Sequence, residues 1–223
     1  MTREKVRARI EEIGIIPAIR VSSAEDALFA ADAISGGGIP IVELTMTVPG
    51  AIDVISALVR NSPKVIVGAG TVWDTETARR CLDAGAQFLV SPALNIETIE
   101  FAAKEKMLMM AGALTPTEIV KAWKAGSDFV KVFPCGQVGG AKYIKAIKGP
   151  LPQIPLVPTG GVNLNTAAEF LEAGAEALGI GGELVQAAAL KSGKPEVITE
   201  IASQFVAIVK STRQRLAPAA SLV

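Results

Sequence analysis

Short apolar runs typical of buried β-strands alternate with amphipathic runs typical of α-helices eight times in this 223-residue sequence. Small residues and glycine stand at several helix ends, as in Asp83-Ala84-Gly85 and Glu172-Ala173-Gly174. Eight alternations indicate a closed parallel (β/α)₈ barrel, the TIM-barrel architecture, far better than an open doubly wound sheet. The predicted strands cover residues 15–20, 41–45, 64–69, 87–90, 107–111, 129–133, 156–158 and 177–180.

Two further amphipathic segments lie outside these units. Residues 2–13 place Val6, Ile10 and Ile13 among charged residues and predict an N-terminal helix that caps one end of the barrel. Residues 195–213 predict one more helix near the end of the chain. We therefore expect a single barrel domain over residues 1–213, followed by a frayed C-terminal tail over residues 214–223.

The charge and the composition argue against several classes of function. Lys plus Arg and Asp plus Glu each number 22, and no basic run is present, so nucleic acid is not expected as a partner. The N-terminus lacks an apolar signal-peptide core and no apolar run reaches membrane-spanning length, so we expect a cytoplasmic protein with no membrane partner. Histidine is absent, which excludes Ser-His-Asp and Cys-His catalysis and every histidine-ligated zinc site.

One lysine stands in the middle of the sixth predicted strand, Phe129-Val130-Lys131-Val132-Phe133. A buried ammonium group must reach solvent, pair with a carboxylate or lose its proton, and a neutral amine is a nucleophile toward carbonyl groups. The alternative is a lysine at a strand end whose stem packs while its charged head reaches water. The strand alone does not distinguish these two interpretations.

Two other charged residues share the inward face of the predicted barrel with Lys131. Side chains alternate along a strand, so Glu43 lies on the same face as Ile41 and Thr45, and Arg20 on the same face as Ala18. Lys131, Glu43 and Arg20 can therefore converge in the barrel interior. Because charged residues are rarely buried unpaired, they form either an active site or a structural ion pair between Lys131 and Glu43.

Small residues end the third, seventh and eighth predicted strands. Gly68-Ala69-Gly70-Thr71 offers bare backbone and a hydroxyl, which suit a carboxylate. Pro158-Thr159-Gly160-Gly161 and Gly179-Ile180-Gly181-Gly182 stand at the two loops where such barrels commonly bind phosphate through backbone N–H groups. Turns need glycine for conformational reasons, but two pairs at these loops predict an anion pocket.

A lysine in the barrel interior, a carboxylate beside it and an anion pocket at the mouth together indicate Schiff-base chemistry on an anionic carbonyl compound. Lys131 would attack the ketone, and the resulting iminium would accept electrons from the bond that breaks. Glu43 would move protons, directly or through a water molecule.

These motifs, in this order on successive strands, resemble the family of 2-keto-3-deoxy-6-phosphogluconate (KDPG) and 4-hydroxy-2-oxoglutarate (KHG) aldolases, which are class I aldolases of the Entner–Doudoroff type. The resemblance runs from about residue 16 to residue 185. The motifs that carry it are Ile16-Pro17-Ala18-Ile19-Arg20, Val42-Glu43-Leu44-Thr45, Val67-Gly68-Ala69-Gly70-Thr71-Val72, Ser91-Pro92, Val130-Lys131-Val132-Phe133-Pro134, Pro158-Thr159-Gly160-Gly161-Val162 and Ile180-Gly181-Gly182.

The resemblance implies a lyase that works without metal or cofactor, assembles as a homotrimer and reversibly cleaves a 2-keto-3-deoxy acid to pyruvate and an aldehyde. The implied substrate is KDPG, with glyceraldehyde 3-phosphate as the aldehyde. The family's Schiff-base lysine then corresponds to Lys131 and its general acid/base to Glu43. The implied substrate-binding residues are Thr71 and Pro92 at the pyruvyl end, Phe133 beside the imine, and Thr159, Gly160, Gly161, Gly181 and Gly182 around the distal phosphate.

Two positions depart from the family pattern. Some members bind the substrate carboxylate with an arginine in the loop after the glutamate's strand, but here that loop reads Thr45-Met46-Thr47-Val48-Pro49, so we expect Arg20 to supply the charge. Glu183 stands where the family commonly has a serine. Either this carboxylate turns outward as a helix cap, or the distal end of the substrate is not a phosphate.

From the residues alone, other functions stay open. The chain could be an aldolase for KHG or another unphosphorylated 2-keto acid, a barrel isomerase or synthase in which Lys131 acts electrostatically, or a non-catalytic barrel that binds a metabolite or serves in an assembly. The expected partners are small molecules, namely a 2-keto acid, pyruvate and an aldehyde phosphate, together with further copies of the chain.

The two cysteines and the two tryptophans are expected to be structural. Cys135 lies near the mouth without an evident base beside it, and Cys81 reads as a helix core position. Trp73 and Trp123 are expected to pack at the rim of the barrel.

Overall fold

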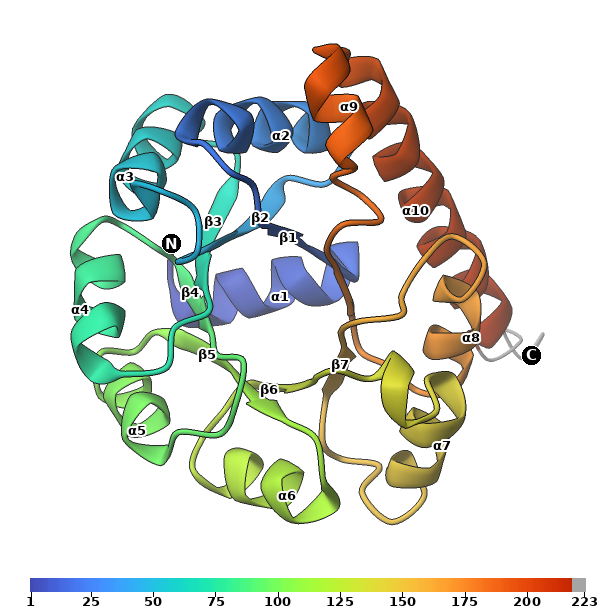
Figure 1. Ribbon diagram of the computed structural model, residues 1–223. Coiled ribbons are helices and arrows are strands. Elements are labelled where there is room, and N and C mark those ends of the chain that lie inside the picture. The colour runs from blue at the N-terminus through green and yellow to red at the C-terminus, as the bar shows by residue number, and fades with distance from the viewer. Residues whose placement is uncertain (218–223) are drawn as a thin grey trace, which may run out of the picture.

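The computed structural model describes residues 1–217 and confirms the predicted (β/α)₈ barrel (Figure 1). Its parallel strands are β1 (Ile15–Ile19), β2 (Ile41–Thr45), β3 (Ile66–Gly70), β4 (Phe88–Val90), β5 (Leu108–Ala113), β6 (Phe129–Val132), β7 (Leu156–Pro158) and β8 (Leu178–Ile180). Strands β1 to β7 pair in sequence order and β1 also pairs with β8, while an isolated bridge between Thr159 and Gly179 joins the β7 and β8 sides. The sheet thereby closes on itself.

Helices surround the sheet on the outside (Figure 1). They are α1 (Arg3–Ile13), α2 (Ala24–Gly36), α3 (Ala51–Asn61), α4 (Thr75–Asp83), α5 (Ile96–Lys104), α6 (Pro116–Lys124), α7 (Ala141–Lys148), α8 (Ala167–Glu172), α9 (Ala187–Ser192) and α10 (Pro195–Leu216), with a short 3₁₀ helix, η1 (Gly136–Val138), after β6.

Several helices begin where the sequence supplies a side-chain cap. Ser23 and Asp74 accept hydrogen bonds from backbone N–H groups in the first turns of α2 and α4. Thr115 and Glu118 cap the start of α6 reciprocally. These caps satisfy N–H groups that have no partner within the helix. They thereby fix the residue at which the loop after the strand ends and the helix begins.

The amino-terminal end of the barrel is covered by α1, which lies across the middle of the ring behind the strands in Figure 1. Val6 and Ile10 on this helix are buried in the core, as expected from their spacing. The opposite end, where the strands finish, is the end toward the viewer. It is therefore at the carboxyl ends of the strands that the barrel interior can open to solvent.

The structure departs from the sequence-based expectations at several places. The third strand begins at Ile66, because residues before it form a turn in which Val65 N donates to Ser62 O. The helix after β8, for which Glu183 was a possible cap, is α9 and begins at Ala187; the preceding Gln186 forms no side-chain cap, so its sequence carries little start signal. Trp73, expected to pack at the rim, is 68% exposed.

The C-terminal helix is longer than expected. It continues through Leu216, three residues past the predicted end at Arg213, so the first residues of the expected frayed tail are helical. Residues 218–223 of that tail lie outside the described part of the chain. The single-domain boundary at residue 213 stays a prediction. Within residues 1–217, no helix has both the length and the apolar character needed to span a membrane.

Burial on α10 provides a test of how this last helix contributes to the barrel. Phe205 is fully buried, on a helix that packs against α2 and α8. We expect Phe205→Ala to lower the free energy of unfolding by about 3–5 kcal/mol, because it leaves a cavity in the core. Denaturant unfolding followed by circular dichroism measures this. Gln204→Ala, at the adjacent exposed position, serves as the control and should change stability by less than about 0.5 kcal/mol.

Candidate active site

A buried ion pair lies inside the barrel between strands on opposite sides. Lys131 Nζ from β6 lies 3.6 Å from Glu43 Oε1 of β2. The two residues are 7% and 3% exposed, respectively. Glu43 Oε1 has no hydrogen-bond partner among the described residues, so its only neighbour of opposite charge is the ammonium group beyond hydrogen-bond distance. The carboxylate oxygen is therefore available to accept a proton from a ligand.

Small residues beside the pair create the space that it occupies. Gly70 is the last residue of β3, the strand next to that of Glu43, and a side-chain carbon at this position would overlap the Glu43 carboxylate. Gly112, the register partner of Lys131 in β5, leaves room for the backbone of Pro92 and Ala93. Phe133 lies next to Lys131, with the ring centroid 5.6 Å from Nζ, within cation–π range. The sequence thus provides room for the carboxylate and an aromatic face beside the amine.

Arg20 enters the mouth from the end of β1 and is held by two hydroxyl groups. Its guanidinium donates to Thr47 Oγ1 at 3.2 Å and to Thr71 Oγ1 at 3.4 Å. Thr47 is in turn 2.8 Å from Thr45 Oγ1, which donates to Ile19 O. No carboxylate lies within ion-pair distance of Arg20 in residues 1–217, so its charge is available to an anionic ligand.

Thr71 has an unusual backbone conformation. Its φ of 61° lies in the left-handed region, which is rare for a β-branched residue. Such a conformation costs on the order of 1–3 kcal/mol and persists where the surrounding structure holds it in place. Here it turns the chain sharply after Gly70 and places the Thr71 hydroxyl against Arg20.

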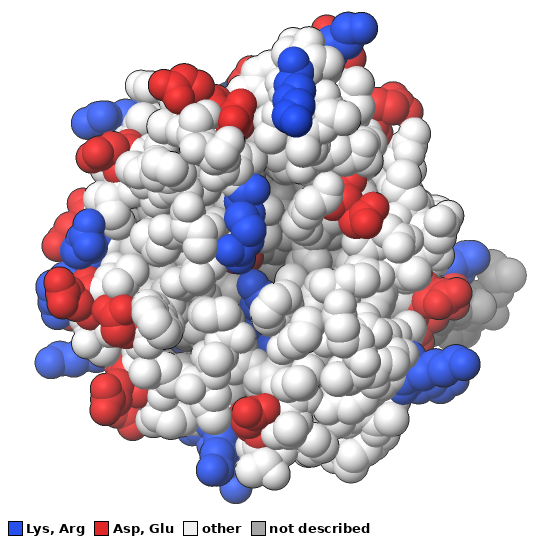
Figure 2. Space-filling view, viewed as in Figure 1, with Lys and Arg blue, Asp and Glu red and all other residues white. Residues whose placement is uncertain are grey.

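These residues line one cavity of about 670 Å³ at the carboxyl ends of the strands. Figure 2, drawn from the same side as Figure 1, shows a hollow at the centre of this face with Lys and Arg atoms exposed inside it. All the sequence-predicted site residues lie on its wall. They are Arg20, Glu43, Thr71, Pro92, Lys131, Phe133, Thr159, Gly160, Gly161, Gly181 and Gly182.

The wall also includes residues that sequence reasoning did not assign to the site. Ala18 and Gly179 lie on β1 and β8, and Val162 follows the Gly160–Gly161 pair. A side-chain carbon at Gly179 would overlap the Thr159 hydroxyl, which explains the glycine. The position of Ala18 was foreseeable, since it precedes Arg20 by two residues and so shares its face.

Glu183 lines the same cavity. The alternative in which it caps a helix is wrong, because Glu183 lies in the turn after β8 and the residue that precedes α9 is Gln186. Its side chain is exposed at the mouth and forms no ion pair within the described residues. A negative charge therefore faces the same cavity as Arg20 and Lys131.

The two cysteines are buried, in agreement with a packing role. Burial raises the pKa of the Cys135 thiol to about 11. Burial likewise raises the pKa of Cys81 to about 12. Both groups are therefore thiols near neutral pH, and neither is a nucleophile for the adjacent cavity.

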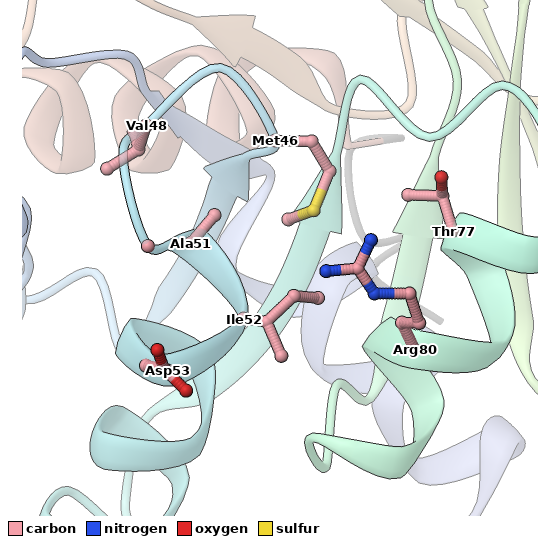
Figure 3. A pocket seen from close by; sticks show the side chains of 8 residues that line it. Met46, Val48, Ala51, Ile52, Asp53, Thr77 and Arg80 are labelled. Carbon is pink, nitrogen blue, oxygen red and sulfur yellow. The ribbon is translucent and has the colours of Figure 1, made fainter.

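A second cavity, of about 440 Å³, lies between the starts of α3 and α4 (Figure 3). Met46 points into it, and its sulfur lies 3.6 Å from Cys81 Sγ. Arg80 and Asp53 also line this cavity without forming an ion pair with each other. It shares no lining residue with the Lys131 cavity, so it is not part of that site.

Comparison with known proteins identifies similar chains. The family model described as "KDPG and KHG aldolase" matches residues 6–201. A 2-dehydro-3-deoxy-phosphogluconate aldolase of Treponema pallidum is 33% identical over 201 residues, which cover 90% of this chain and 95% of the relative. The KHG/KDPG aldolase of Escherichia coli K12 is 35% identical over 193 residues, covering 86% and 90% of the two chains.

A solved structure adds a chemical observation about a relative. The crystal structure of KDPG aldolase from Legionella pneumophila, with pyruvate captured as a covalent carbinolamine intermediate, superposes with a TM-score of 0.82 and 31% identity. The match covers 88% of this chain and 95% of that one. The relative therefore shares both the barrel and a substantial part of the sequence.

The buried pair can be tested through stability. Lys131→Met should lower the free energy of unfolding by roughly 2 kcal/mol, since it leaves the Glu43 carboxylate buried without a cation. The cost is smaller than for a fully enclosed pair because the cavity admits water. The double variant Lys131→Met, Glu43→Leu should recover most of that loss in denaturant unfolding. Additive losses in the double variant would contradict a coupled pair.

Proposed function

Because the chain belongs to the family of KDPG and KHG aldolases, we propose that its reaction proceeds through a Schiff base on Lys131. The chain is a lyase, a pyruvate aldolase that cleaves 2-keto-3-deoxy-6-phosphogluconate to pyruvate and glyceraldehyde 3-phosphate. KHG is compatible as a further substrate. The observation that carries the mechanism is the Lys131–Glu43 pair, 3.6 Å apart at the base of an otherwise open cavity.

The first steps attach the substrate to Lys131. The ammonium group loses a proton, for which the Glu43 carboxylate is the nearest acceptor, and the amine attacks C2 of the keto acid to give a carbinolamine. Loss of water then forms the iminium. The covalent carbinolamine of pyruvate in the Legionella relative supports this sequence of steps.

The next steps break and rebuild bonds around Glu43. As the C3–C4 bond breaks, Glu43 takes the proton of the C4 hydroxyl, the aldehyde leaves, and the bonding electrons pass to the iminium to give an enamine on Lys131. Protonation of C3 restores the iminium of pyruvate, and water hydrolyses it to release pyruvate and the free lysine. Glu43 is suited to both proton transfers because Oε1 has no competing hydrogen bond in residues 1–217.

The remaining wall residues would hold the two ends of the substrate. Arg20, together with the Thr71 hydroxyl, would bind the carboxylate beside the reacting ketone. Pro92 and Phe133 would pack against the pyruvyl part. The residues of the loops after β7 and β8 would lie along the distal part; these are Thr159, Gly160, Gly161, Gly181 and Gly182.

The working form that we propose is a cytoplasmic homotrimer of this single barrel domain. Support for it comes from the family resemblance of the motifs on successive strands. The reactants are small molecules, in line with a cavity of about 670 Å³.

Trapping of the imine tests the proposal most directly. Incubation with pyruvate and borohydride should add one reduced pyruvyl group to the wild-type chain, because only an imine is reduced to a stable adduct. Intact mass spectrometry measures the adduct. Lys131→Ala should show none, while remaining folded by circular dichroism. No adduct on the wild type would favour the non-catalytic or the isomerase alternative, and an equal adduct on Lys131→Ala would place the imine on a different amine and contradict the role of Lys131.

The role of Arg20 can be separated from that of Lys131. Arg20→Ala should raise KM for the keto acid about tenfold or more with a smaller change in kcat, because a charged hydrogen bond to the carboxylate is lost. Steady-state kinetics measure both constants. Arg60→Ala, an exposed arginine at the end of α3 away from the cavity, is the control and should leave both unchanged. Unaltered kinetics in Arg20→Ala would exclude this role.

A further inference from the structure

The charges in the catalytic cavity are distributed unevenly around its mouth. Arg20 donates its hydrogen bonds to Thr47 and Thr71, which belong to the loops after β2 and β3. Its positive charge therefore lies toward the β1–β3 side. The loops after β7 and β8 contribute glycines and one charged residue, Glu183, to the wall.

This distribution orients the substrate. The proposed reaction places the C1 carboxylate near Arg20 and C2 at Lys131 Nζ, so the remaining carbon chain must extend away from the β1–β3 side. Apart from Pro92 after β4 and Phe133 after β6, the wall on that side comes from β8 and from the loops after β7 and β8. The far end of the substrate therefore lies against the part of the wall that carries the Glu183 carboxylate.

The local structure leaves that carboxylate free to act on a ligand. Glu183 is exposed in a turn, and no Lys or Arg in residues 1–217 lies within ion-pair distance of it. Gly181 and Gly182, directly before it, have open space around them. Within residues 1–217 no ion-pair partner therefore neutralises its charge at the mouth.

We propose that Glu183 is a specificity-determining residue that disfavours a terminal phosphate and favours a neutral, hydroxylated far end of the 2-keto-3-deoxy acid. The proposal rests on the function proposed above and refines its substrate class. A carboxylate repels a phosphate that carries up to two negative charges, whereas it accepts hydrogen bonds from hydroxyl groups. KDPG is then cleaved against this repulsion, and the corresponding acid without phosphate is accepted alongside it.

The test compares two substrates that differ only in the phosphate, KDPG and 2-keto-3-deoxygluconate. Glu183→Gln removes the charge and keeps the shape of the side chain. We expect it to raise the ratio of kcat/KM for KDPG to kcat/KM for 2-keto-3-deoxygluconate about tenfold, because one charge repulsion is removed. Most of the change should come from KDPG. Pyruvate release, measured for both substrates with wild type and variant, gives the ratio.

A matched control separates a local effect from a change of overall charge. Glu169→Gln makes the same substitution on α8 at an exposed residue that lines the neighbouring cavity beside Gly161, and it should change the ratio by less than about twofold. A ratio unchanged by Glu183→Gln, or shifted equally by Glu169→Gln, would overturn the proposal. Equal loss of activity on both substrates in Glu183→Gln would overturn it too, since the residue would then act in the reaction itself.

Failure of the proposed function gives a different result. In that case the wild type would release no pyruvate from either substrate and form no borohydride-trapped adduct with pyruvate. If the wild type forms the trapped adduct but Glu183→Gln leaves the ratio of the two kcat/KM values unchanged, the aldolase function is supported and only the role of Glu183 is rejected.

Discussion

The site depends on one ion pair placed inside the barrel, between Lys131 on β6 and Glu43 on β2. Burying two charges is costly unless they face each other and a polar space, so the surrounding residues must provide both. Gly70 leaves room for the carboxylate, and the cavity above the pair admits water and ligand. The pair lies near the carboxyl ends of the strands, with the apolar core on its amino-terminal side. At this position the charges are buried in the barrel and still accessible to a ligand in the cavity.

The second constraint is the arrangement that holds Arg20 in the mouth. Two threonine hydroxyls from neighbouring loops accept hydrogen bonds from its guanidinium. One of them, on Thr71, is positioned by a left-handed backbone conformation. Hydroxyl groups orient the cation without neutralising it, which a carboxylate partner would do. The charge therefore remains available to a substrate anion, next to the amine that would attack the adjacent ketone.

The proposed role of Glu183 would place substrate preference on a loop of a shared fold. The strands determine where Lys131 and Glu43 lie, whereas the loops after the strands determine what lies at the far end of the substrate. Glu183 belongs to such a loop, and a substitution there alters the electrostatics at the mouth without disturbing the core. On this proposal, chemistry and substrate preference would lie on different parts of the chain, so that one could change without the other.

Much of this protein was determined by the sequence alone. The eight alternations predicted the barrel, and the period-two pattern of β1, β2 and β6 placed Arg20, Glu43 and Lys131 on its inner face, because side-chain direction along a strand is a local property. Glycines after the third, seventh and eighth strands marked the mouth, because the site of such a barrel is built from the loops at the carboxyl ends of its strands. The sequence could not determine that Trp73 is exposed, that α10 continues to Leu216, or that Glu183 faces the cavity and does not cap a helix. Nor could it show that Thr47 and Thr71 hold Arg20, since these contacts join loops that are distant in the chain. The parallel pairing of β1, β2 and β3 brings these loops together, and the packing around each side chain then decides its direction.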